Sequence, residues 1–369
     1  MKCAVVGGGS IGLRHRKILE SLGHHVALIS AHAPDAEFKS LAIALDQSEF
    51  EYVVVASETS RHFDDLETLA RAGFSGRVLV EKPLFEKPRK SNVKNFATLG
   101  VGYNLRFHPG ITWLTEKVQE LGGLTSAQFY VGQYLPTWRT GTEYSRSSSA
   151  KRQSGGGALR DLSHELDLVQ FLFGDWNSLT AIGGRFSDLK IETDDTFSIL
   201  LQTTMCPAVS VSVNYLDRTT QRNMTINGNY GTLRLDLIDG VGRFNETETR
   251  FETGTEETYL SQHRAMLAGD QEMLCSFGEG QRVVEMIQAI EKSASKQKWS
   301  KNENTLHRLR PRRLEGGREQ KPSIDQLQTP DRLFDRAGFG DGTFRANRGQ
   351  QRQRGDQASR AQKWRDIRS

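Results

Sequence analysis

The chain has 369 residues, of which 36% are hydrophobic and 25% charged, a balance typical of a soluble globular protein with more than one core. No apolar run approaches the length of a membrane span, so we expect no membrane-spanning helix. The net charge is +4, but residues 301–369 carry 17 Lys and Arg against 9 Asp and Glu, which leaves 32 basic and 36 acidic side chains elsewhere. This mildly acidic body gives no electrostatic reason to expect nucleic-acid binding.

Short apolar runs alternate with helical patterns over residues 1–120. We expect strands within residues 2–9, 25–30, 52–57 and 77–83, helices within 11–23 and 61–73, and a further strand that turns into a helix over 99–111. Alternating strands and helices predict an α/β domain with a parallel sheet and right-handed crossovers.

The pattern changes after about residue 122. Segments rich in strand formers and separated by turn residues occupy 125–136, 179–189, 195–205, 208–216, 223–237 and 240–248. They predict a largely antiparallel sheet in a second α/β domain, residues 121–299. One helix is expected from Gly155 to Gly174, and the segment 261–298 is expected to be helical and to close the domain.

Residues 300–369 are rich in Arg, Gln and Gly and show no sustained apolar period. This composition predicts a disordered basic tail. An RNA-binding tail is the weaker interpretation, because aromatic residues are sparse.

The three cysteines, Cys3, Cys206 and Cys275, are isolated and form no CxxC. Their number fits a reducing cytoplasm and predicts neither a disulfide framework nor a metal site. The sequence opens on a strand-like run, so we expect no signal peptide and a cytoplasmic protein.

A glycine motif, G-x-G-x-x-G, joins the first strand to the first helix. Gly7 permits the tight turn, Gly9 lets the backbone approach a pyrophosphate, and Gly12 allows close packing of helix on sheet. With Ser10 and Ile11, whose backbone lies at the helix N-terminus, they form the predicted dinucleotide site.

The residue that binds the ribose of a dinucleotide lies at the end of the second strand, where an NAD site usually carries Asp or Glu. This sequence offers Ser30, Ala31 and His32 instead. Without a carboxylate to repel a 2′-phosphate, the cofactor prediction stays open between NAD and NADP.

Ligands of an open parallel sheet bind beyond the carboxyl ends of its strands. Lys82 follows one such end, where it can donate to a substrate oxygen, although the same pattern also fits a surface lysine paired with a carboxylate. The other residues predicted at these ends are Ser57, Thr59, His62, Glu81 and Asn104 for the cofactor, and Arg106 for the substrate.

The order of these motifs resembles the Gfo/Idh/MocA family of sugar and polyol oxidoreductases over residues 1–299. The resemblance is carried by the glycine turn, EKPL from Glu81, GYNLRFHP from Gly102, and the GGG-led helix with Asp and His. It implies a Rossmann domain, residues 1–120, beside an α/β domain whose open sheet supports a homo-oligomer, a dimer or a tetramer. It also implies that Lys82, Asp161 and His164 act at the substrate.

One feature departs from the family pattern. The family spacing is D-x-x-x-H, whereas Asp161 and His164 are three residues apart. Both spacings keep two side chains on one helix face, and Glu165 becomes an alternative acid or base. The polar loop before this helix adds three candidate substrate residues, Trp138, Arg139 and Tyr144.

The predicted activity is hydride transfer between a nicotinamide and a sugar or sugar-nucleotide carbinol, with His164 moving the proton and Lys82 stabilising the oxygen. The alternatives are a catabolic dehydrogenase of the inositol or glucose type, and a ligand sensor that binds NAD(P) without turnover. Surface-sugar biosynthesis is suggested by the tail. When permitted codons are read one frame over, the segment from Leu306 resembles the amino-terminal part of CMP-sialic-acid synthetase-like cytidylyltransferases, which predicts a frameshift or an out-of-frame overlap.

Overall fold

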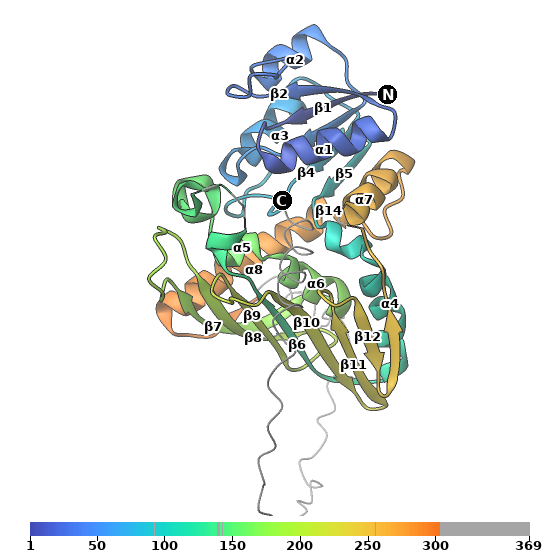
Figure 1. Ribbon diagram of the computed structural model, residues 1–369, viewed down its shortest axis with the longest axis vertical. Helices are drawn as coiled ribbons and strands as arrows, with labels where there is room; N and C mark the ends of the chain where they lie inside the picture. Colours follow the sequence, from blue (N-terminus) through green and yellow to red (C-terminus); the bar gives the residue numbers. More distant parts are fainter. Residues whose placement is uncertain (92, 139–140, 142, 255, 303–369) are drawn as a thin grey trace, which may run out of the picture.

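The computed structural model describes residues 1–302 apart from 92, 139, 140, 142 and 255. Two domains lie one above the other, each built on its own sheet (Figure 1). The disordered tail was predicted from residue 300, but Ser300–Lys301 form a strand paired with the second sheet. The rest of the predicted tail, residues 303–369, lies outside the described residues.

The first domain contains a six-stranded sheet in the order β14-β5-β4-β3-β1-β2. Its first five strands pair in parallel, as predicted, and β14 adds an antiparallel edge. These strands are almost wholly buried because helices cover both faces of the sheet. The elements are β1 (Lys2–Val6), β2 (His25–Ile29), β3 (Tyr52–Val55), β4 (Arg77–Val80), β5 (Thr98–Val101), β14 (Cys275–Ser276), α1 (Ser10–Ser21), α2 (Leu41–Gln47), α3 (His62–Arg71) and α7 (Glu257–Ala268).

The second domain contains a nine-stranded sheet in the order β13-β12-β11-β10-β6-β9-β8-β7-β15. The predicted antiparallel pairing holds for every neighbouring pair except β6 and β9, which run in parallel and make the sheet mixed. The strands are β6 (Leu124–Gly132), β7 (Trp176–Gly184), β8 (Thr196–Thr203), β9 (Val209–Asn214), β10 (Gln221–Gly228), β11 (Gly231–Asp236), β12 (Val241–Phe244), β13 (Thr247–Arg250) and β15 (Ser300–Lys301).

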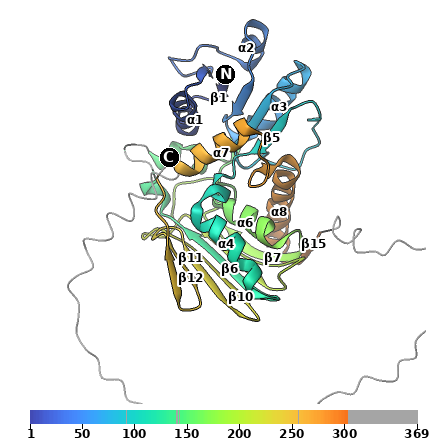
Figure 2. The ribbon, with the colours of Figure 1, turned by 90° about the vertical axis from the view of Figure 1, so that its right-hand side faces the viewer.

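Helices of the second domain pack on one face of this sheet, between it and the first domain (Figure 2). The helices are α4 (Pro109–Lys117), α5 (Ala158–Asp161), α6 (His164–Phe173) and α8 (Phe277–Lys296). The opposite face carries no helix among the described residues. Within that described part, no helix is both long and apolar enough to cross a bilayer.

Two helix predictions need correction. The expected helix from Gly155 to Gly174 is two helices, because the chain leaves helical geometry between α5 and α6. The glycines at the start of the expected helix form a loop instead, in which Gly155 and Gly157 have positive φ. The expected helical segment 261–298 is divided by β14, which returns to the edge of the first sheet. The chain therefore crosses between the domains more than once, and buried residues of both domains form one continuous core cluster.

Candidate active site

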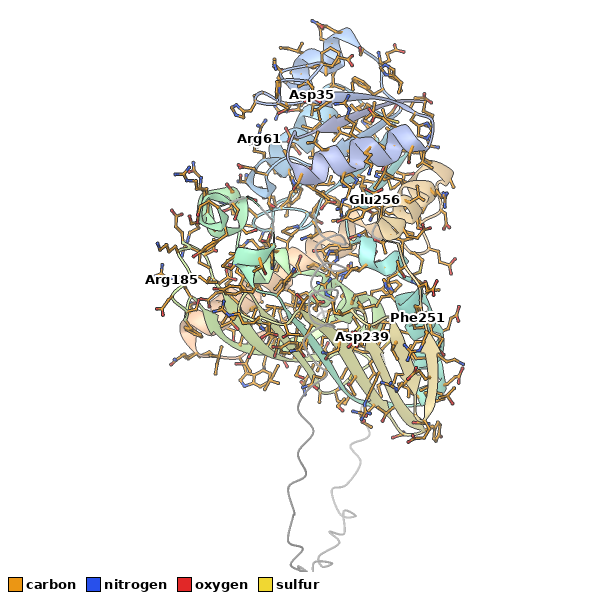
Figure 3. All side chains as sticks on the ribbon, in the orientation of Figure 1. Asp35, Arg61, Arg185, Asp239, Phe251 and Glu256 are labelled. Carbon is orange, nitrogen blue, oxygen red and sulfur yellow. The ribbon has the colours of Figure 1, made fainter. Side chains whose placement is uncertain are left out.

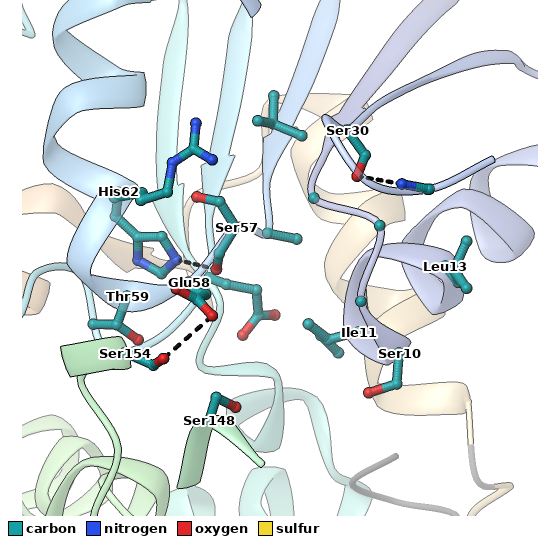
Figure 4. A pocket seen from close by; sticks show the side chains of 18 of the residues that line it. Ser10, Ile11, Leu13, Ser30, Ser57, Glu58, Thr59, His62, Ser148 and Ser154 are labelled. Carbon is teal, nitrogen blue, oxygen red and sulfur yellow. Dashed lines mark hydrogen bonds between the residues drawn. The ribbon is translucent and has the colours of Figure 1, made fainter. Parts of the chain in front are cut away.

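A cavity of about 840 Å³ lies between the two domains at the carboxyl ends of β1 to β4. Figure 4 shows Ser10 and Ile11 on one wall, the segment Ser57 to Thr59 on another, and Ser148 and Ser154 from the second domain below them. Most of the predicted site residues meet here. The cavity is lined by Gly7, Gly9, Ser10, Ile11, Ser30, Ser57, Thr59, His62, Glu81, Lys82, Trp138, Asp161 and His164 from the predicted set.

The glycine turn has the geometry that its sequence predicts. Gly7 has a φ of 116°, and a Cβ there would collide with the carbonyl of Ala56. A Cβ on Gly12 would strike the Gly7 carbonyl, so Gly12 packs under the turn rather than lining the cavity. Nothing lies within 4 Å of a Cβ on Gly9, and α1 begins at the next residue. This open cradle of backbone amides fits a pyrophosphate.

The ribose end of the cavity contains a carboxylate that sequence reasoning did not assign. Asp35, labelled near the top of Figure 3, lines the cavity and accepts a hydrogen bond of 2.7 Å from Arg16. Lys39 lies beside it and donates to the carbonyl of Ala33. The sequence motif places the ribose-binding residue at the end of β2, whereas Asp35 lies six residues beyond that end and was therefore missed.

Lys82 reaches from the end of β4 into the cavity, and its Nζ donates to the carbonyl oxygen of Asp161 at 2.8 Å. Glu81 also lines the cavity, and its carboxylate accepts from the amide of Lys82 and from His15. Burial alone would raise the pKa of Glu81, but the hydrogen bonds from His15 and the Lys82 amide, together with the charge of Lys82, lower it below its ordinary value. The strand end therefore carries an ionised Glu81 behind an amine that faces the cavity.

Asp161 and His164 reach the same cavity from the break between α5 and α6. The carboxylate of Asp161 accepts a 2.6 Å hydrogen bond from Tyr215, a buried residue just beyond β9 that the sequence did not single out. His164 is 4% exposed, and its ring packs edge-on against Tyr103. The spacing of three residues thus brings both side chains to one site without a shared helix.

The alternative acid or base, Glu165, is not at the cavity. Its side chain is fully buried and forms an ion pair with Arg222, with an Oε1–Nε distance of 2.6 Å. Because the next residue of a helix points about 100° away, Glu165 faces the sheet while His164 faces the cavity. We therefore regard Glu165 as structural.

Two further residues predicted at the site lie away from the cavity. Arg106 is 1% exposed and its guanidinium binds both oxygens of Asp167 and one of Glu279. Asn104 is also buried and donates to Thr258, so neither side chain lines the cavity.

Two residues of the loop before α5 were also predicted to bind substrate. Tyr144 accepts from the Lys190 amide and does not line the cavity. Arg139 lies outside the described residues.

Several lining residues were missed because they lie in loops and at strand ends, where sequence patterns say little about direction. Ser154 donates to Glu58 across the domain boundary, as Figure 4 shows. The other missed lining residues include Arg61, Gln133, Ser148, Ser149 and Tyr259.

No cluster of three metal-ligating side chains occurs within the described ranges.

Two family models match this chain. The first, described as "Oxidoreductase family, NAD-binding Rossmann fold", matches residues 1–99, and the second, described as "GFO/IDH/MocA C-terminal domain", matches residues 117–234. The chain belongs to the Gfo/Idh/MocA family. It is thus an NAD(P)-dependent oxidoreductase, as its motifs predicted, and its first domain has the NAD-binding Rossmann fold.

Several solved structures share this fold. GenD2 from gentamicin A biosynthesis, in complex with NAD, is 22% identical, with a TM-score of 0.68 over 82% of this chain and 96% of that one. The WlbA dehydrogenase from Bordetella pertussis, in complex with NADH and UDP-GlcNAcA, is 22% identical, with a TM-score of 0.67 over 82% and 98%. Levoglucosan dehydrogenase, in complex with NADH, is 16% identical, with a TM-score of 0.71 over 82% and 98%.

At these identities the likeness establishes the shared fold. A comparison with curated proteins gives no match.

Proposed function

We propose that this protein is an NAD-dependent dehydrogenase that oxidises a sugar or sugar-nucleotide carbinol, or reduces the corresponding ketone. One observation carries the proposal: Lys82, Asp161 and His164 line the same cavity as the glycine turn. An amine, an imidazole and a dinucleotide cradle in one cavity are the groups that coupled hydride and proton transfer requires.

The dinucleotide would be held by the backbone of the Gly7 to Ser10 turn, and NAD supplies the hydride acceptor when it is bound. Lys82 donates to the substrate oxygen and stabilises negative charge as the C–H bond breaks. His164 accepts the hydroxyl proton, so that the alcohol loses one hydride and one proton and becomes a carbonyl. The backbone carbonyl of Asp161 accepts from Lys82, and its carboxylate accepts from Tyr215.

A sugar substrate is supported by the lining and by the names of similar structures. Gln133, Ser148 and Ser149 add amide and hydroxyl groups to the part of the cavity formed by the second domain, and such groups suit a polyol. One similar structure holds UDP-GlcNAcA. The finer proposal, a role in surface-sugar biosynthesis, rests on the out-of-frame reading of the tail, and sequencing the genomic DNA across this junction tests it.

The test is turnover with a panel of hexoses, inositols and sugar nucleotides, with NAD and NADP, in the wild type and in Lys82→Met. We expect Lys82→Met to lower kcat/KM by about 10²–10³-fold, the usual effect of removing a donor to a developing oxyanion. NADH binding should persist, because Lys82 is not part of the glycine cradle.

The chain offers a matched control. Lys87 stands in a second Glu-Lys-Pro tripeptide five residues later, is exposed, and does not line the cavity. Lys87→Met should behave as the wild type. No turnover with any member of the panel, together with normal NADH binding, would instead favour the ligand sensor.

A further inference from the structure

Four buried polar side chains form a continuous row behind the cavity. Tyr52 contacts Nδ1 of His263 at 2.9 Å, Nε2 of His263 contacts Nδ1 of His15 at 2.8 Å, and Nε2 of His15 contacts Glu81 at 2.9 Å. Tyr52, His15 and His263 are each 0% exposed, and Glu81 is 6% exposed. The row joins β3, α7, α1 and the strand end that carries Lys82.

The direction of these hydrogen bonds follows from counting protons. An ionised carboxylate can only accept, so Nε2 of His15 carries a proton. If His15 is neutral, its Nδ1 must accept, and Nε2 of His263 is then the donor. A neutral His263 must in turn accept at Nδ1, which leaves the hydroxyl of Tyr52 as the donor. With both imidazoles neutral and Glu81 ionised, this is the one arrangement in which every contact is satisfied.

We infer that Tyr52, His263 and His15 form a one-directional hydrogen-bond relay that keeps Glu81 ionised and in place behind Lys82. His15 lies on α1 one turn beyond Gly12, so the relay also ties the cofactor turn to the lysine loop. His263 comes from the far end of the sequence, and Tyr259 of the same helix lines the cavity.

The surroundings support a neutral imidazole at His263. Burial is the main reason that the pKa of His263 lies well below its ordinary value. Gly102 leaves the space that the carboxylate of Glu81 occupies, since a Cβ at position 102 would lie 2.7 Å from its Oε1. The carboxylate is held there by its hydrogen bonds to His15 and to the Lys82 amide.

The reverse arrangement gives a different tautomer. A proton on both nitrogens of His15 would make Nδ1 of His15 the donor, and His263 would then carry its proton on Nδ1. The two arrangements are distinguishable by NMR, because protonated and unprotonated imidazole nitrogens have different ¹⁵N shifts.

The first test is ¹⁵N NMR of the full chain labelled at its nine histidines, with His15→Gln and His263→Gln to assign the signals. We expect both residues to carry the proton on Nε2 alone. A proton on Nδ1 of His263 in the wild type would overturn the inference.

The second test measures the amine of Lys82 directly, by competitive acetylation and mass spectrometry, with the exposed Lys87 as the internal standard. In Tyr52→Phe, Nδ1 of His263 loses its donor, so His263 is free to carry its proton on Nδ1 instead of Nε2. His15 then keeps its bond to His263 by carrying its own proton on Nδ1, and Glu81 keeps its bond to the bare Nε2 of His15 by taking up one proton from solvent. Lys82 then loses the neighbouring negative charge, and we expect its acetylation to become about threefold faster. Tyr130→Phe, which removes a hydroxyl bonded to Asp217 in the second sheet, is the matched control and should not change the rate.

An unchanged rate in Tyr52→Phe would contradict the relay. The importance of Lys82 rests on the proposed function, but neither readout needs turnover. A failure of the dehydrogenase proposal is therefore distinguishable from a failure of the relay.

Discussion

Tyr215 fixes the orientation of Asp161 from outside the helices that carry the site. Its hydroxyl donates to the Asp161 carboxylate at 2.6 Å, and Trp138, which lines the cavity, packs edge-on against its ring. The tyrosine is fully buried, so its ring has little freedom to move. We regard Tyr215 as a positioning residue for the carboxylate.

Tyr215→Phe should therefore lower kcat about tenfold while changing KM little, because a charge-assisted hydrogen bond contributes more than a neutral one. The measurement is steady-state kinetics with the substrate found in the panel. Tyr130→Phe serves again as the control for the loss of a tyrosine hydroxyl. Equal kcat values for Tyr215→Phe and the wild type would show that Tyr215 is not a positioning residue for Asp161.

Single residues also show where sequence reasoning succeeds and where it stops. Lys82 and Arg106 both follow a strand of the first sheet, but only Lys82 faces the cavity. A strand-end position predicts the edge of the sheet and not the direction of the side chain. Arg106 turns inward because Asp167, 61 positions away, provides its partner, and sequence spacing cannot reveal such a pair.

Among the elements, the short helix α5 depends on a carboxylate at its start. Asp194 accepts from the Leu159 amide at 2.8 Å, and its own carbonyl accepts from Ala158. Gly157 has a φ of 123°, and a Cβ there would collide with the Asp194 side chain. Asp194 thus supports the loop and the helix that present Asp161.

The pKa of Asp194 gives a pH-dependent stability. Burial raises this pKa to about 6, although the Leu159 amide and Arg160 oppose the rise. Because the unfolded value lies near 4, the folded protein holds an extra proton between about pH 4 and 6, and the free energy of unfolding falls as the pH rises through that window.

In Asp194→Asn this contribution is absent. Between pH 4 and 7, the free energy of unfolding by urea should fall by about 2 kcal/mol more in the wild type than in the variant. Parallel pH profiles for the two proteins would contradict the raised pKa of Asp194.

The link between α6 and β10 is a buried ion pair. Glu165 and Arg222 are each 1% exposed at the side chain. Arg222→Met would leave the carboxylate buried without its partner, and we expect a loss of about 3–5 kcal/mol in the free energy of unfolding by urea. Arg243→Met breaks an exposed pair with Glu248 and should change little. A small effect in both variants would show that the buried pair is not stabilising α6.

Sequence patterns best predicted the elements whose apolar residues follow one clear pattern. The parallel strands of the first domain are continuous apolar runs, and they lie where they were expected. The break between α5 and α6 was missed because the apolar residues Leu159, Leu162 and Leu166 continue across it. Similarly, β14 is two residues long, and its pairing with β5 depends on a contact 174 positions apart.

At the scale of the whole molecule, the second sheet has one face that no helix of the described residues covers. Ile182 on β7 and Leu200 on β8 are 74% and 55% exposed on that face. The predicted homo-oligomer would cover them, because exposed apolar side chains on neighbouring strands favour association.

Light scattering of the full chain should give a dimer or a tetramer, and Leu200→Arg should shift it towards the monomer. Ile43→Arg, on the exposed surface of α2 in the other domain, is the control and should keep the wild-type mass. A monomeric wild type would contradict the prediction, and an unchanged mass for Leu200→Arg would exclude this face as the interface.

The most direct measurement is a crystal structure of the chain with NADH, since the whole account requires one reaction site between the domains. We predict the pyrophosphate on the Gly7 to Ser10 turn and the nicotinamide C4 within about 5 Å of both the Lys82 amine and the His164 imidazole. A nicotinamide ring more than about 10 Å from these two groups would contradict hydride transfer at this site.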